Sequence, residues 1–278
     1  MGQILIWGIV LLYIIGMIAI GISSARKTKT LTDFVVGGRK AGPWMSAFAY
    51  GTTYFSAVIF IGYAGRSGFQ FGWWAVLIGV ANAFIGTYLA WKILAGKTRD
   101  VTRRLKIKTM PQMFEQRYNS KNMKTFSAII IFVFMIPYSA SVYSGLSYLC
   151  EAVLKVDYHW AMVAIAAVAA VYLILGGYLA SLKADLVQGI IMIVGVIAMV
   201  FFMVRSNQVG GLQAGLSSLT NVMKQEGIFK LTPQLIVSLG GLCLLTSVGS
   251  WGMPQMIQKF YGVADNKGIK AGTIISTA

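Results

Sequence analysis

The sequence is poor in charge: 12% of its 278 residues are Asp, Glu, Lys or Arg, whereas 57% are apolar. Its mean hydropathy is +0.71. A water-soluble domain of this length needs a larger polar surface, so the composition argues against that class. It predicts an all-α integral membrane protein, built as a multi-span helical bundle.

Cysteine and histidine are also scarce, with two Cys and one His. Cys150 and Cys243 both lie in apolar segments, which argues against a disulfide framework. His159 alone cannot build a catalytic triad or a metal cluster, and the sequence contains no glycine-rich phosphate loop. We therefore expect no enzyme, no organic cofactor and no transition metal.

Long apolar runs make up most of the sequence, and runs of about 17 to 25 residues predict membrane-spanning helices. The first run has no basic residue ahead of it and is too long for a signal-peptide core, so we expect a retained anchor. The predicted spans lie at about 3–24, 42–65, 70–94, 125–150, 160–180, 186–205 and 233–258, and an eighth begins near Ile269.

Basic residues predict the orientation, because Lys and Arg near span ends stay in the cytoplasm. With the N-terminus outside the cell membrane, most of the 24 Lys and Arg residues, Lys259 among them, fall on the inner side. This orientation accounts for the net charge of +16, and we expect no nucleic-acid partner. The basic residues left outside are Arg66, Lys155, Arg205, Lys224 and Lys230.

Two connecting segments are long enough to hold structure of their own. In the inner segment, 95–124, Pro111 suits the start of a short helix lying at the membrane surface. The outer segment, 206–232, is either a lid or a passive connector.

The span at 42–65 carries polar groups where lipid would exclude them: Gly51, Thr52, Thr53, Tyr54 and Ser56. Irregular polar backbone is tolerated at membrane depth only inside protein or against a water-filled cavity. An unwound turn here would free carbonyls for a cation and N–H groups for an anion. Alternatively, the small residues allow close helix packing, with the hydroxyls bonded to preceding carbonyls.

The span at 233–258 has a second cluster, formed by Gly249, Ser250, Gly252 and Pro254. Proline removes a backbone donor and clashes with the preceding turn, so it interrupts a helix. The two interrupted spans enter from opposite sides in the predicted topology. This arrangement is typical of an inverted-repeat transporter with a binding site near the membrane midplane.

Asp185 is an acid at the predicted start of the span at 186–205. A carboxylate there either caps the helix or binds a cation beside the membrane interior. The sequence leaves both interpretations open.

Five segments together resemble the sodium:solute symporter family, whose members carry proline, pantothenate, sugars or sialic acid. The segments are FVVGGRKAGPW, AYGTTYFSAVIFIGYAG, TMPQMFEQRYNSK, LGGYLASLKADLVQGIIM and GMPQMIQKFYGVADNKGIKAGTIIST. The resemblance implies a leucine-transporter-type core of two inverted five-helix repeats after an extra N-terminal helix at about 3–24. The first repeat would occupy about 42–205, and a truncated second repeat about 233–278.

The resemblance also implies sodium-coupled symport of a small polar organic solute by alternating access. Proline carriers of the family have Asp where this chain has Tyr54, and aromatic residues where it has Thr246 and Ser250, which argues against proline as the solute. The sequence around the span at 42–65 looks closer to that of the pantothenate-type members. The implied sodium ligands are the carbonyls of Thr52 and Phe55, with Ser56 alongside, and the carboxylate of Asp185. The implied solute-facing residues are Thr53, Tyr54, Thr246, Ser250 and Trp251, and the implied hinge residues are Gly51, Gly249, Gly252 and Pro254.

The last apolar run stops at Ala278 with fewer residues than the roughly 20 that a span needs, so we expect a partial sequence. Two alternatives to transport stay open. One is a membrane-embedded binding or sensory module, and the other is a non-functional fragment. The sequence does not identify the solute or the oligomeric state.

Overall fold

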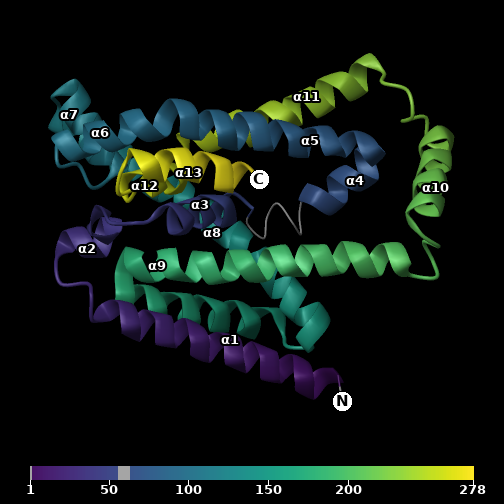
Figure 1. The fold of residues 1–278 in the computed structure, drawn as a ribbon, viewed down its shortest axis with the longest axis horizontal. Helices are drawn as coiled ribbons and strands as arrows, with labels where there is room; N and C mark the ends of the chain where they lie inside the picture. The colour runs from purple at the N-terminus through teal and green to yellow at the C-terminus, as the bar shows by residue number, and fades with distance from the viewer. Residues whose placement is uncertain (1, 56–62) are drawn as a thin grey trace.

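The computed structural model describes residues 2–55 and 63–278, and the regular elements in this part of the chain are all helices (Figure 1). Five helical stretches there are long and apolar enough to cross a membrane. Their outward surfaces carry large exposed apolar side chains such as Ile4, Phe132 and Phe202, which suit contact with lipid. The longer helices are α1 (Gly2–Ala25), α8 (Lys121–Leu154), α9 (Tyr158–Arg205) and α11 (Pro233–Val248).

Shorter helices make up the remainder of the bundle. The segments η4 and η5 are wound as π-helix, and η1, η3 and η6 as 3₁₀-helix. Their bounds are α2 (Leu31–Val36), η1 (Gly37–Arg39), α3 (Pro43–Tyr54), α4 (Gly65–Phe71), η3 (Gly72–Ala75), α5 (Val76–Ala81), η4 (Asn82–Leu89), η5 (Trp91–Ala95), α6 (Gly96–Arg104), α7 (Met110–Tyr118), α10 (Leu212–Gln225), η6 (Gly249–Gly252), α12 (Pro254–Tyr261) and α13 (Asn266–Thr277).

The helix α9 consists of two helices joined at Gly177, whose φ of 58° and ψ of −150° are not helical. A Cβ at this position would lie 2.8 Å from the carbonyl oxygen of Phe34, so the turn requires glycine. The second helix therefore begins at residue 178 rather than 186. Asp185 lies about two turns inside it, and the interpretation of Asp185 as a helix cap is wrong.

The two long connections lie at opposite ends of the molecule. Figure 1 shows α2, α6 and α7 at one end and α10 at the other. The helix predicted near Pro111 is α7, which has this proline in its first turn. At the far end, α10 packs on η3 through Met223, whose side chain fills the space beside Gly72.

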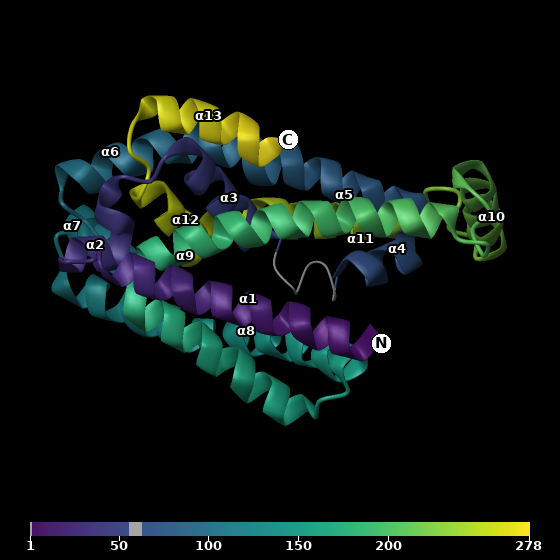
Figure 2. The ribbon, with the colours of Figure 1, turned by 60° about the horizontal axis from the view of Figure 1, so that its bottom comes forward.

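Close packing between α1 and α9 depends on small residues. Figure 2 shows α1 running beside the first half of α9, with α8 next to them. A Cβ at Gly21 would lie 3.0 Å from the Cα of Tyr172, and one at Gly176 would lie 2.8 Å from the Cβ of Ser24. Glycine at these positions allows the two backbones to approach, as in membrane helix pairs generally.

An aromatic core joins α3, η5 and α12. The ring of Phe260 lies 5.4 Å from that of Tyr50 and 5.1 Å from that of Trp91. The backbone of α13 lies against Trp91 at Gly272, where a Cβ would clash with the indole. This core packs α3 against α12, and the candidate site lies at the break that follows α3 and the break that precedes α12.

Candidate solute and sodium site

The first helix break lies at the end of α3. This helix continues through Gly51 and ends at Tyr54, and Phe55 adopts the non-helical angles φ −85° and ψ 60°. The interruption expected at Gly51 therefore occurs four residues later, with the Phe55 N–H still donating to the Gly51 carbonyl at 2.8 Å. A helix end leaves carbonyls without intrahelical donors, which suits cation binding. Ser56 lies outside the described residues.

The second break lies between α11 and α12. The α-helix α11 ends at Val248, and the 3₁₀ turn η6 begins at Gly249. Met253, which follows this turn, is extended, with φ −71° and ψ 126°. Pro254 then opens α12 in the first turn, where its missing N–H costs no hydrogen bond. The residues Gly249, Gly252 and Pro254 therefore surround a true interruption, and the extended residue itself is Met253.

Both breaks face one cavity of about 510 Å³, called here the central cavity. Thr53 and Tyr54 contribute from the end of α3, whereas Tyr138 and Ser141 contribute from α8. The structure thus brings four of the five predicted solute-facing residues together, although they are almost 200 positions apart. The lining from the second break includes Thr246, Gly249, Ser250, Met253 and Met256.

Hydrogen bonds join the walls of the central cavity. The Tyr54 hydroxyl donates to the carbonyl of Thr246 at 2.8 Å. The hydroxyls of Thr246 and Ser247 both lie 2.8 Å from Oδ1 of Asn82, which is 5% exposed. Sequence reasoning missed Asn82. A lone amide in the apolar run VANAFIG was the available signal, since polar side chains at membrane depth are usually functional.

Trp251 does not line the central cavity. Its indole N–H donates to the carbonyl of Ile85 at 3.0 Å, and its ring packs against the aromatic core. The Tyr50 hydroxyl donates to the next carbonyl, that of Gly86, at 2.9 Å. Both acceptors belong to the π-helical segment η4, a type of winding that is frequent at functional sites. Trp251 therefore secures η6 against η4.

Thr52 uses its side chain within the helix bundle. Its hydroxyl donates to the Phe48 carbonyl at 2.7 Å, as the close-packing alternative expected. Its methyl group faces Gly189 of α9, where a Cβ would lie 2.8 Å from it. The predicted sodium role of Thr52 rests on its backbone carbonyl, which this side-chain bond does not involve.

Asp185 forms an ion pair with Lys259 of α12, with 2.7 Å between Oδ2 and Nζ. Both side chains are largely buried, at 16% and 7% exposure. The ammonium also lies 5.5 Å from the centre of the Tyr178 ring. Lys259 is therefore not one of the exposed charges of the inner side, because α12 packs back into the bundle. A buried acid requires a partner, but the sequence pattern could not identify this one.

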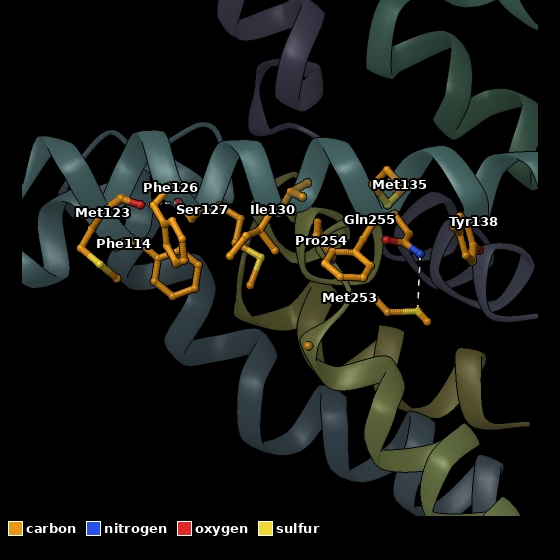
Figure 3. Close-up of a pocket in the computed structure, with 14 residues that line it drawn as sticks. Phe114, Met123, Phe126, Ser127, Ile130, Met135, Tyr138, Met253, Pro254 and Gln255 are labelled. Carbon is orange, nitrogen blue, oxygen red and sulfur yellow. Dashed lines mark hydrogen bonds between the residues drawn. The ribbon is translucent and has the colours of Figure 1, made fainter.

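Two further cavities share lining residues with the central one. An inner cavity of about 370 Å³ lies between α2, α3, α9 and α12 and shares Thr53 with the central cavity. A lateral cavity of about 520 Å³ shares Tyr138 and Met253 with it. Figure 3 shows the apolar wall that α8 gives to the lateral cavity, with Met253, Pro254 and Gln255 close to it. Met253 lines the lateral and central cavities, and Gln255 lines the lateral and inner cavities. The start of α12 therefore contacts all three cavities.

The sequence is similar to those of several curated carriers. It is 30% identical to the sodium/proline symporters of Salmonella typhimurium and Escherichia coli over 258 residues, which are 89% of this chain and 49% of each relative. It is also 30% identical to the high-affinity proline transporter PutP of Bacillus subtilis, over 91% of this chain and 53% of the relative. The chain thus spans about half the length of these relatives, which are all named for proline rather than pantothenate.

The fold resembles that of a solved sodium-coupled sialic acid symporter in a substrate-bound, outward-open state, with a TM-score of 0.71 and 18% identity. That alignment covers 98% of this chain and 56% of the neighbour. The sodium:solute symporter family matches residues 34–278, which include both helix breaks and the ion pair. By this match, the chain belongs to the sodium:solute symporter family.

Proposed function

We propose that this protein serves sodium-coupled symport of a small polar organic solute by alternating access. The observation that carries the proposal is that two interrupted helices face the same cavity, whose lining includes the hydroxyl residues Thr53, Thr246 and Ser250. Interrupted helices at membrane depth are tolerated where they line a binding site, and transporters use them in this way. Membership of a family of sodium:solute symporters supports the same function.

Sodium would bind at the end of α3, through the carbonyls of Thr52 and Phe55 with Ser56 alongside. The carboxylate of Asp185 would either bind a further sodium ion or contact sodium on its exit path. By ordering the end of α3, sodium would favour solute binding through a coupling free energy of about 1–3 kcal/mol.

The solute would bind in the central cavity, against Thr53, Tyr54, Thr246 and Ser250. Its hydroxyl-rich lining supports a polar solute, because buried polar groups reward a ligand that pairs with them. Trp251 would not contact the solute. It would position η6 through the hydrogen bond from its indole N–H to the Ile85 carbonyl.

The proposed setting is the cell membrane, with the N-terminus outside. The bundle would consist of an extra helix at 3–24, a first five-helix repeat at 42–205 and the start of a second repeat at 233–278. The separation of α10 from α2, α6 and α7 along the molecule supports opposite sides for the two long connections (Figure 1).

The test is uptake of radiolabelled proline, pantothenate, a sugar and sialic acid into proteoliposomes, with an inward sodium gradient or with potassium in its place. We expect one solute to accumulate only with sodium. Thr246→Val, which removes a hydroxyl from the central cavity, should reduce that uptake at least several-fold. Thr220→Val, on the distant helix α10, is the matched control and should leave uptake unchanged.

Uptake that ignores the sodium gradient would overturn the proposal. Solute binding without any flux would instead favour the alternative of a membrane-embedded binding or sensory module.

A further inference from the structure

The inner cavity has a polar wall that the proposed sodium and central solute sites do not use. Ser181 and Tyr178 line it from α9, and Gln258 and Lys259 line it from α12. The Gln258 amide donates to the Val35 carbonyl at 3.0 Å, which fixes α12 against α2. A cavity of about 370 Å³ that is lined by hydroxyl, amide and ammonium groups has the size and the chemistry of a small-molecule site.

Lys259 is the charged group of this cavity, and its side chain is 7% exposed. An ammonium has three donors, and one of them is directed at Oδ2 of Asp185 at 2.7 Å. A second carboxylate that reached the ammonium from the cavity would form another charge-assisted hydrogen bond. Because the site is largely shielded from water, such a bond is worth more here than at the surface.

The central cavity and the inner cavity adjoin at Thr53, which lines both of them. A solute that moves past Thr53 from the central cavity would come to the wall that contains Lys259. The inner cavity lies beside α2, at the end of the molecule opposite α10 (Figure 1). A solute that crosses from the α10 end would therefore meet Lys259 after the central cavity.

We propose that the inner cavity is a second solute site, which binds the carboxylate of the solute through Lys259. Asp185 is the internal competitor that holds the ammonium while the inner cavity is empty. This inference rests on the proposed transport function and narrows its substrate class to solutes that carry a carboxylate. Neutral sugars lack the group that Lys259 recognises.

The test compares carboxylate ligands with analogues in which an uncharged group replaces the carboxylate. Purified protein in lipid nanodiscs, with sodium present, is titrated with proline and proline methyl ester, and with pantothenate and pantothenol. We expect the wild type to prefer one of the two carboxylates by at least tenfold. Lys259→Gln should abolish that preference, Lys259→Arg should keep it, and Asp185→Asn should keep or increase it because the competitor is gone.

The double variant Asp185→Asn with Lys259→Gln separates recognition from folding. It removes both charges at similar volume, so it should fold with near wild-type thermal stability but show no preference for carboxylates. If the ion pair has only a structural role, both single variants should lower the affinity for every ligand by the same factor. A double variant that still prefers the carboxylate would overturn the proposal.

A labelling experiment locates the site. Ser181→Cys, in a background with Cys150→Ser and Cys243→Ser, should react slowly with a thiol reagent when the preferred carboxylate is present. Protection should disappear with Lys259→Gln. If the carboxylate does not protect the Ser181→Cys variant while sodium-driven uptake persists, the proposal of an inner solute site is refuted and the proposed transport function stands. Loss of sodium-dependent uptake in the wild type would refute the transport function itself.

Discussion

At the scale of single residues, the segment η4 supplies two groups on which the central cavity depends. Asn82 accepts hydrogen bonds from Thr246 and Ser247, and thereby joins η4 to α11. Gly86 lets the Tyr54 ring lie directly against the backbone, since a Cβ there would clash with the ring and its hydroxyl. The Asn82 amide thus accepts the hydrogen bonds that connect η4 to α11, and Gly86 leaves room for the Tyr54 ring.

Replacing Asn82 with Leu should destabilise the protein by about 1–3 kcal/mol, because the buried Ser247 hydroxyl loses its acceptor. Thermal unfolding in detergent measures the change. Asn221→Leu, at an exposed position of α10, is the control and should have little effect. Equal melting temperatures for the two variants would show that the Asn82 bonds contribute nothing.

Replacing Gly86 with Ala should also destabilise the protein, by about 1–3 kcal/mol, because the added methyl group forces Tyr54 away from η4. The control is Gly79→Ala in the preceding helix α5, where a Cβ meets nothing within 4 Å. That change should be neutral or slightly stabilising, since alanine favours helix. The melting temperature should therefore fall for Gly86→Ala and not for Gly79→Ala, and a Gly86→Ala variant as stable as the wild type would contradict the close contact with Tyr54.

At the scale of elements, two arginines of α6 hold the chain that follows α12. Arg99 and Arg103 both donate to the carbonyls of Val263 and Ala264, at distances of 2.8 to 3.3 Å. Arg103 also lies 2.9 Å from the carbonyl of Arg39, in η1. These bonds place the positive charges just beyond the C-terminal end of α12, where the helix dipole favours them. The second broken helix is therefore tied to α6 and η1.

Replacing Arg103 with Gln should loosen this connection and lower stability by about 1–3 kcal/mol, because several carbonyls lose a charged donor. Limited proteolysis should cut faster within 262–265, and the melting temperature should fall. Arg104→Gln removes the same charge from the neighbouring exposed position and serves as the control. If both variants are cleaved at the wild-type rate, these bonds do not hold the segment.

At the scale of the whole molecule, three cavities share lining residues inside the bundle. The lateral and inner cavities both touch the central one, and α10 lies at the end away from α2 and α7 (Figure 1). The side of the membrane that each cavity would face depends on which end of the molecule faces the cytoplasm.

The proposed orientation can be tested with single exposed cysteines in a background with Cys150→Ser and Cys243→Ser. Ser217→Cys, on α10, should react with a membrane-impermeant thiol reagent in intact cells. Gln116→Cys, on α7, should react only after the cells are permeabilised. The reverse pattern would place the N-terminus inside and invert the topology.

The sequence alone determines the membrane class, most of the spans and the two interrupted helices. It does so because hydrocarbon imposes local requirements: long apolar runs where the chain crosses, and Gly, Pro and hydroxyl groups only where the backbone is protected. These requirements can be read within a window of some 20 residues. The clusters at Gly51–Ser56 and Gly249–Pro254 were found for this reason.

Only the tertiary structure decides which polar groups meet. Lys259 pairs with Asp185, 74 positions away, and Asn82 bonds Thr246, 164 positions away. Neither pairing has a local signal, because each depends on how α9, α12, η4 and α11 pack. The same is true of Trp251, which sequence reasoning placed beside the solute and which instead bonds to Ile85. Contacts between helices are set by packing in three dimensions, and a linear pattern does not contain it.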